Sequence, residues 1–196
     1  CAGHPDIIVA VLDEGVDVTH PDLAASMWVN EGETFGSIED ADGNGYAGDR
    51  HGYNFVKQTG KITVNSRYDT GHGSHVAGAV AARNNNGIGI KSIAGGDGSA
   101  DSGVRIMSCQ IFAGEYVGPL LDEVRAIKYA ADNGAVILQC SWGYTSGAAN
   151  PYDWGQQFAT DEEWILYNPL EKQALDYFVE TAGSASGVIE GGIAVF

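Results

Sequence analysis

Residues 7–15 read IIVAVLDEG, a short run of apolar and mostly β-branched side chains that ends in two acidic residues and a glycine. A run of this length without polar alternation is typical of a strand that is buried on both faces. The acidic turn places Asp13 at the carboxyl end of this strand, where open α/β sheets carry their functional residues. Residues 7–15 therefore predict an inner strand of a mainly parallel sheet.

Further strands and helices alternate along the rest of the chain. The apolar runs predict strands at 104–112, 135–140 and 192–196, and the helical periodicity predicts helices at 74–83, 119–133 and 169–181. This alternation favours an α/β fold with a doubly wound, mainly parallel sheet and helices on both faces. We expect one domain over residues 1–196.

Two segments lack a clear period. Residues 30–69 are polar and rich in Gly and Asp, which predicts a long insertion within the domain. Residues 144–164 hold Tyr144, Tyr152, Trp154, Phe158 and Trp164, and we expect an aromatic loop there.

Composition excludes several classes of protein. The chain has 196 residues, is 44% hydrophobic, and carries 10 basic against 26 acidic residues, a net charge of −16. A chain of this length can bury a core without metals or disulfides. The negative charge and the absence of a basic cluster exclude nucleic acid as an expected partner. No run of about 18 apolar residues predicts a membrane span, and no signal peptide is recognisable.

Three cysteines, Cys1, Cys109 and Cys140, cannot all pair within one chain. Cys109 and Cys140 lie in strand-like apolar runs, so we expect buried free thiols rather than a disulfide framework. The cysteines therefore do not decide the cellular compartment. Cys1 is compatible with a native, a lipidated or a cut terminus, and we favour the last.

Two longer motifs carry a family resemblance. Residues 9–23 read VAVLDEGVDVTHPDL and residues 70–78 read TGHGSHVAG. Together and in this order they resemble the aspartate and histidine motifs of the subtilisin-like serine proteases, and the similarity continues through residues 84–90 and 141–143. The resemblance implies a peptide hydrolase acting on polypeptides, secreted or in the cell envelope.

The resemblance assigns Asp13 and His72 to an Asp/His/Ser triad. A serine hydroxyl needs a neutral imidazole to take its proton, and the imidazole needs a carboxylate to fix its tautomer. His72 is expected at the start of a helix. Taken singly, Asp13 could be a turn residue, and His72 with His75 could be two metal ligands on one helix face, although no third ligand has a recognisable spacing. We expect His75 to pack against the helix's neighbours.

Glu14 departs from the family pattern, which usually has Ser or Thr at this position. A second carboxylate beside Asp13 would raise the pKa of Asp13 by repulsion. We therefore expect the Glu14 side chain to turn to solvent.

The resemblance also implies a substrate-binding segment. Ser141, Trp142 and Gly143 would line the primary specificity pocket and pair through their main chain with an extended peptide. Trp142 is equally compatible with a core position.

Two places in the chain suggest Ca²⁺ as a structural cofactor, with no cofactor for catalysis. Residues 40–49 read DADGNGYAGD, and Asp40, Asp42 and Asn44 offer alternating oxygen ligands. The EF-hand's last glutamate is missing, so an ordered acidic turn stays open. By resemblance, Asp22 and Asn85 match calcium ligands of the family, although one extra residue lies between Asn84 and Gly87.

The nucleophile motif of the family, Gly-Thr-Ser-x-Ala-x-Pro, and its oxyanion-hole asparagine are absent from the sequence. We therefore expect residues 1–196 to be an incomplete catalytic domain, inactive alone, with the missing C-terminal part as its partner. An exposed sheet edge would favour self-association. A pseudoprotease or peptide-binding module is the alternative. A nucleotide-binding protein is excluded because the Gly-rich segments follow neither phosphate-binding pattern.

Overall fold

The computed structural model describes residues 2–64, 69–114, 116–144 and 158–196. Its main sheet has five parallel strands in the order β2-β3-β1-β6-β7. The strands are β1 (Ile8–Asp13), β2 (Gly52–Asn54), β3 (Arg105–Gln110), β6 (Ala135–Gln139) and β7 (Ile193–Val195). Parallel neighbours need crossover connections, and helices supply most of them. The predicted fold class is confirmed.

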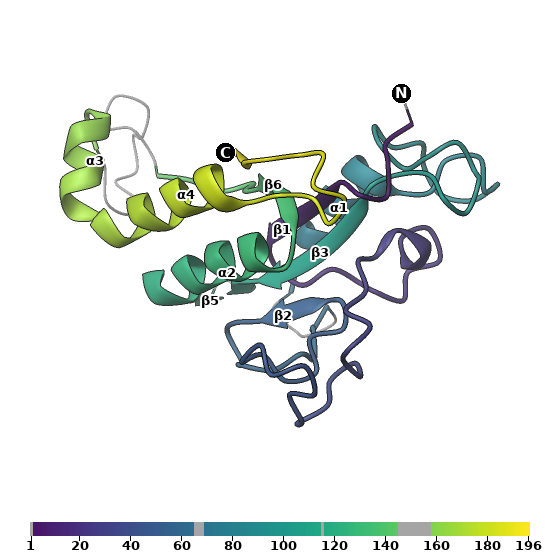
Figure 1. Cartoon of the computed structure of the whole chain (residues 1–196), viewed down its shortest axis with the longest axis horizontal. Helices are drawn as coiled ribbons and strands as arrows, with labels where there is room; N and C mark the ends of the chain where they lie inside the picture. The colour runs from purple at the N-terminus through teal and green to yellow at the C-terminus, as the bar shows by residue number, and fades with distance from the viewer. Residues whose placement is uncertain (1, 65–68, 115, 145–157) are drawn as a thin grey trace.

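Helices cover both faces of this sheet. They are α1 (His72–Ala81), α2 (Leu120–Asp132), α3 (Asp161–Tyr167) and α4 (Pro169–Thr181), with a short 3₁₀ turn at Ala24–Ser26. Figure 1 shows α2 and α4 side by side on one face, with α1 on the other. Successive side chains of β1 pack alternately against the helices on the two faces, because a strand's side chains alternate between faces. Val9 and Val11 pack with α1, whereas Ala10 and Leu12 pack with α2 and α4.

The register of the strands sets the position of Asp13. It lies opposite Gln110 at the end of β3, and Val11 of β1 lies opposite Gln139 at the end of β6. The carboxyl ends of β1, β3 and β6 therefore meet at one edge of the sheet, where a parallel sheet binds its ligands.

Several elements were not expected from the sequence. The insertion at 30–69 contributes β2, which extends the sheet beside β3. Its residues Tyr46 and Phe55 pack edge-to-face with Tyr129 of α2, and Tyr53 packs edge-to-face with Tyr46. These contacts fix the insertion to the domain. The predicted strand at 104–112 is also divided, because β4 (Phe112–Ala113) and β5 (Tyr116–Val117) form a separate antiparallel pair.

The aromatic segment 144–164 is not a loop throughout. Its end forms the start of α3, for which the Thr160 hydroxyl accepts a hydrogen bond from the Glu163 backbone N–H at 3.2 Å. A threonine followed three residues later by glutamate is a capping box, a sequence signal of a helix start. Tyr152 and Trp154 lie outside the described residues.

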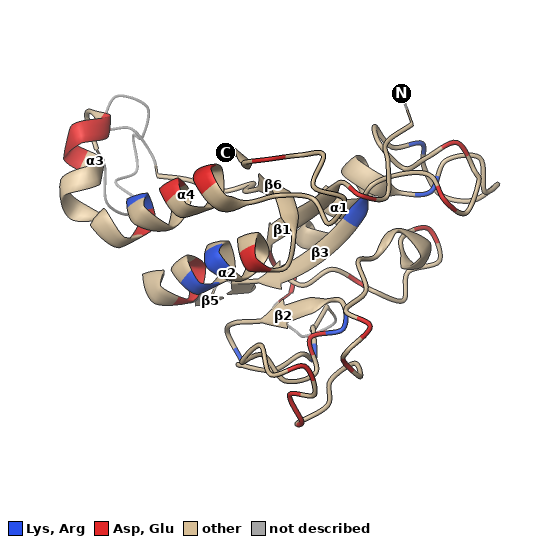
Figure 2. Ribbon diagram, in the orientation of Figure 1, with Lys and Arg blue, Asp and Glu red and all other residues tan. Residues whose placement is uncertain are grey.

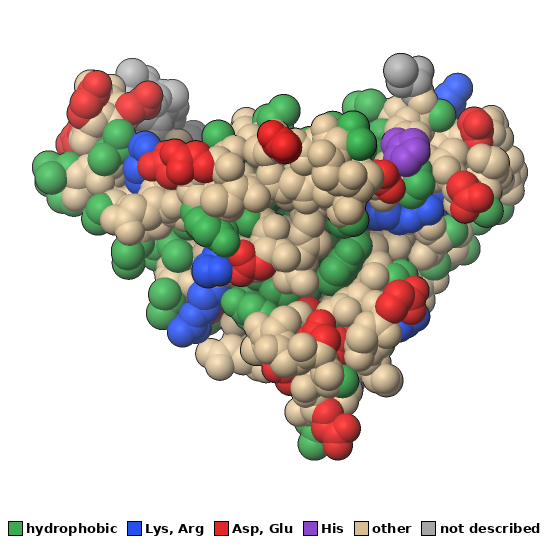
Figure 3. Space-filling view, viewed as in Figure 1, with side chains coloured by type: hydrophobic (Ala, Val, Ile, Leu, Met, Phe, Trp, Pro, Cys, Tyr) green, Lys and Arg blue, Asp and Glu red, His purple; other side chains and the backbone are tan. Residues whose placement is uncertain are grey.

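Acidic side chains are spread over the molecule. They lie on α2, α3, α4 and the connecting loops, interspersed with few Lys and Arg (Figure 2), and the face in Figure 3 shows them gathered over α3 and α4 and on the loops. Cys109 and Cys140 are buried free thiols, as predicted, whereas Cys1 lies outside the described residues. Among the described residues, no helix is both long and apolar enough to cross a membrane. The edge strand β7 exposes Ile193 and Val195, and self-association there stays a prediction.

Candidate active site

Asp13 and His72 meet at the carboxyl edge of the sheet. Asp13 is 1% exposed, and both of its carboxylate oxygens lie 2.8 Å from Nδ1 of His72. An ionised carboxylate only accepts hydrogen bonds, so the imidazole proton lies on Nδ1. In the neutral imidazole Nε2 is then the unprotonated nitrogen, and half of the His72 side chain (49%) is exposed. The pair thus presents a base to the solvent side of the sheet.

Burial is the main influence on the Asp13 carboxyl group. It raises the pKa of Asp13, while the hydrogen bonds from His72 and from the Glu14 backbone N–H lower it, and the nearby Glu14 charge raises it further. A carboxyl group whose pKa is higher in the folded state than in the unfolded state costs stability once it ionises. The ionised Asp13 therefore opposes folding at neutral pH.

The start of α1 lies very close to the end of β1. Gly71, which precedes the helix, has a left-handed φ of 81°. A Cβ atom on Gly73 would clash with the Glu14 carbonyl group, so only glycine permits this approach. These glycines bring His72 to the carboxylate of Asp13.

Glu14 is buried, and the prediction that it turns to solvent is wrong. Its carboxylate accepts hydrogen bonds from the Thr70 backbone N–H at 3.0 Å, the Thr70 hydroxyl at 3.0 Å and the His72 backbone N–H at 3.1 Å. No side chain of the preceding residue caps α1. The first N–H groups of a helix lack partners within the helix and attract negative charge. Glu14 therefore caps the helix that carries His72.

A cavity of about 170 Å³ lies over this pair. Its lining includes Asp13, His72, Phe112, Gly114 and Ser141. The predicted substrate-binding residue Ser141 is thus next to the predicted catalytic pair. No serine hydroxyl in the described ranges bonds to the His72 ring, and the Ser141 hydroxyl accepts from Gln139 at 3.1 Å.

Trp142 packs at the end of the sheet while its neighbours stay exposed. The indole N–H donates to the Leu12 carbonyl at 2.8 Å, and the ring packs edge-to-face with Phe112 and Phe196. The main chain of residues 141–143 has no backbone hydrogen bond to any other described residue. Within the described ranges, the backbone groups of residues 141–143 are thus open to pairing with an extended peptide.

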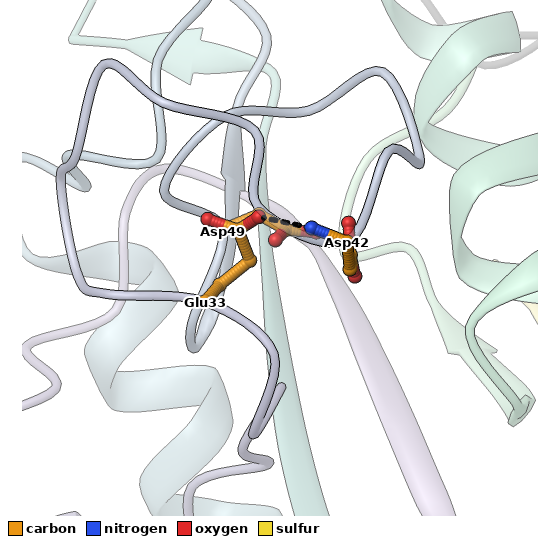
Figure 4. A group of neighbouring side chains, drawn as sticks. All are labelled: Glu33, Asp42 and Asp49. Atoms are coloured by element: carbon orange, nitrogen blue, oxygen red, sulfur yellow. Dashed lines mark hydrogen bonds between the residues drawn. The ribbon is translucent and has the colours of Figure 1, made fainter.

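Three carboxylates from the insertion converge on one point. Glu33, Asp42 and Asp49 place one oxygen each within 4.8 Å of one another (Figure 4). Asp42 was predicted as a ligand and Asp49 lies in the quoted acidic stretch, but sequence analysis missed Glu33. Asp40 instead caps the turn by accepting from the backbone N–H groups of residues 43–45, and the Asn44 amide bridges Asp42 and Asp49.

The donor set of this cluster fits a hard cation. All three charged ligands are oxygen donors, as Ca²⁺ requires. Asp49 is fully buried, and burial raises its pKa. The amide nitrogens of Asn30 and Asn44 now donate to the carboxylates of Asp42 and Asp49, which compensates part of their charge.

The second predicted calcium pair is not brought together. Asp22 accepts a hydrogen bond from the Asn86 side chain at 2.6 Å and from the Ile90 backbone N–H at 3.0 Å. Asn85 has a left-handed φ of 61° and donates instead to the Asp97 carbonyl. The extra residue in this turn therefore moves Asn86, not Asn85, to Asp22, and the predicted Asp22/Asn85 pair is wrong.

The pairing of His72 and His75 as metal ligands has no support in the described residues. The group of carboxylates in the insertion is the one possible metal cluster found there, and it contains no histidine. His75 is exposed, so the expectation that it packs is also wrong.

A buried carboxylate that orients an exposed imidazole is the arrangement by which nucleophilic hydrolases position the histidine that acts as their base. A sequence profile of the subtilase family, peptidase S8, matches residues 4–187. The chain therefore belongs to the subtilase family, as the motifs predicted.

Several known proteins are similar to the chain. Fervidolysin of Fervidobacterium pennivorans is 33% identical over 187 residues, 91% of this chain and 20% of that protein. Its crystal structure superimposes with a TM-score of 0.50 at 28% identity, over 90% of this chain and 20% of that one. Subtilisin-like protease 1 of Plasmodium vivax is 33% identical over 138 residues, 69% of this chain and 20% of that protein.

The halolysin-like extracellular serine protease Nep of Natrialba magadii is 30% identical over 141 residues, 72% of this chain and 21% of that protein. The chain thus spans about a fifth of the length of these three curated relatives.

The role of Glu14 can be tested through stability. Glu14→Ala removes the acceptor of three hydrogen bonds at the start of α1 and should lower the free energy of unfolding by about 2 kcal/mol. Glu14→Gln keeps an acceptor oxygen and should lose less. Urea unfolding measures both, with Glu39→Ala on the exposed insertion as the control. An unchanged midpoint for Glu14→Ala would show that Glu14 does not hold the helix.

Proposed function

We propose that this chain is the Asp/His part of a subtilisin-type serine endopeptidase that hydrolyses peptide bonds. The observation that supports it is the bond from His72 Nδ1 to buried Asp13, with Nε2 left free over a cavity. The serine and the oxyanion donors would come from a part of the protein outside residues 1–196. Residues 1–196 alone would then be inactive.

The chemistry of the pair follows from its geometry. With Nδ1 donating to Asp13, Nε2 can accept the proton of a serine hydroxyl as that oxygen attacks the peptide carbonyl. The imidazolium that forms is stabilised by the carboxylate 2.8 Å away, which stays ionised. Nε2 then returns the proton to the leaving amine.

The substrate would be a polypeptide in extended conformation. The free backbone groups of residues 141–143 would pair with it and place one peptide bond over His72. We also propose that the protein acts outside the cell or in the envelope, since the similar protein of Natrialba magadii is named as extracellular.

A fluorophosphonate probe tests this function on the full-length protein. We expect labelling of one serine, loss of labelling in His72→Ala, and hydrolysis of unstructured peptides. Retained folding and peptide binding without labelling or hydrolysis would instead identify a pseudoprotease or peptide-binding module.

The role of Asp13 can be tested with a substitution that should affect activity and stability differently. Asp13→Asn should lower turnover about 10⁴-fold, because the amide favours the wrong imidazole tautomer. The melting temperature should stay equal or rise, because the substitution removes a buried charge that opposes folding. Peptide hydrolysis and thermal unfolding on one preparation measure both. A loss below tenfold would show that another carboxylate orients the base.

We further propose a structural Ca²⁺ held by Glu33, Asp42 and Asp49, with no part in catalysis. The cation would neutralise the three carboxylates and fix the insertion against the sheet. Its stabilisation depends on concentration, and reaches about 2.7 kcal/mol when free Ca²⁺ is a hundredfold above its dissociation constant.

Thermal unfolding in CaCl₂ and in EDTA tests the calcium site. We expect a higher melting temperature in CaCl₂, and Asp42→Asn should abolish the difference. Asp40→Asn is the matched control, because Asp40 caps the turn without joining the cluster, and it should keep the difference. An equal melting temperature for the unmodified protein in both solutions would exclude a calcium site.

A further inference from the structure

A second, larger cavity lies beside the proposed peptide-binding segment. It has a volume of about 630 Å³ and shares Trp142 and Gly143 with residues 141–143. Five aromatic residues line it, Trp142, Tyr144, Phe158, Trp164 and Phe196, and Asp161 of α3 adds an exposed carboxylate to its rim. A peptide paired with residues 141–143 would thus pass over His72 and beside this cavity.

A carboxylate lies in the wall of this aromatic cavity. Glu171 of α4 is 1% exposed, and its Oε2 accepts a hydrogen bond from the Tyr144 hydroxyl at 2.8 Å. Glu123 of α2, which does not line the cavity, interacts electrostatically with Glu171. Oε1 of Glu123 is buried with no hydrogen-bond partner in the described part of the chain. Two acidic groups therefore meet where α2 and α4 pack together.

The two acidic groups repel each other. Burial, and then the charge of Glu171, raise the pKa of Glu123 to about 9. Glu123 is therefore protonated at neutral pH and is linked to Glu171 by a hydrogen bond. A buried carboxylate such as that of Glu171 is costly unless a cation or further hydrogen-bond donors compensate it.

The described residues supply no cation to this pair. Neither Glu123 nor Glu171 forms an ion pair there. Lys172 also lines the cavity, but its ammonium group is bound by Asp176. The sequence holds no Lys or Arg between Lys128 and Lys172, so residues 145–157 add none. The compensating charge is thus missing from this part of the chain.

We propose that the cavity receives a lysine or arginine side chain of the peptide substrate, and that Glu171 is the residue that selects it. This inference rests on the proposed function, because the peptide reaches the cavity only when it is paired with residues 141–143. The aromatic walls suit such a side chain, since its alkyl part packs on rings and its cationic head is attracted to their faces.

An apolar substrate side chain fits this cavity less well. It would fill the space beside the buried Glu171 carboxylate without giving that group a further partner. A cation at the same place would instead form a charge-assisted hydrogen bond with Glu171. The cavity therefore discriminates against neutral side chains as well as in favour of basic ones.

Peptide series on the full-length protein test the inference. In each series one position within five residues of the cleaved bond is varied, and it is occupied in turn by Arg, Lys, Gln or Leu. We expect one position at which Arg and Lys exceed Leu in kcat/KM by about tenfold to a hundredfold, as the loss of a hydrogen bond to a buried charge implies. Glu171→Gln should abolish this preference and leave kcat/KM for the Leu peptide equal or higher.

Glu180→Gln is the matched control, because Glu180 lies exposed on the same helix and should keep the preference. Glu171→Gln replaces a buried acidic group by a neutral one, so its melting temperature should not fall. If it fails to fold, Glu171→Asp takes its place and should weaken the preference, because the shorter side chain withdraws the carboxylate from the cavity. Cleavage with no basic preference at any position, or a preference unchanged in these variants, would overturn the inference. Hydrolysis of no peptide at all would instead refute the proposed protease function.

Discussion

The hydrogen bond from His72 to Asp13 depends on the close approach of α1 to the end of β1. Both oxygens of the carboxylate are 2.8 Å from Nδ1, although the two residues come from different elements. The approach needs a glycine at position 73 and a partner for the unsatisfied N–H groups that open the helix. Glu14 supplies this partner. Two adjacent carboxylates therefore have different roles. Asp13 orients the ring, whereas Glu14 holds the backbone that carries it.

The sequence was sufficient for the strands, the long helices and the pair Asp13/His72, because these depend on local periodicity and on two long motifs. Glu14 was misplaced because its partners, Thr70 and His72, lie more than fifty residues away, and repulsion from Asp13 was the visible local effect. Likewise, β2 carries no period of its own and forms by pairing with β3. The start of α3 did have a local signal, the Thr160/Glu163 capping box, which the aromatic composition obscured.

The acidic insertion is connected to the rest of the domain through α2. The Tyr129 hydroxyl donates to Asp49 at 2.7 Å, and the Tyr129 ring packs against Tyr46 and Phe55. Glu123 lies on the same helix, near its start. One helix thus contacts the carboxylate cluster through Tyr129, and Glu171 in the wall of the second cavity through Glu123. The order of the insertion and the position of α2 therefore depend on each other.

A chain with a net charge of −16 has few cations with which to neutralise its buried carboxylates. The structure meets this constraint with N–H and O–H donors at Asp13 and Glu14, which suffices because a helix start and an imidazole lie beside them. The cluster of Glu33, Asp42 and Asp49 has mainly amide and backbone donors, and a bound cation would compensate it better. Glu171 has one tyrosine hydroxyl and an acidic neighbour. Its carboxylate lines the second cavity beside the proposed substrate path, where the substrate itself can bring the charge.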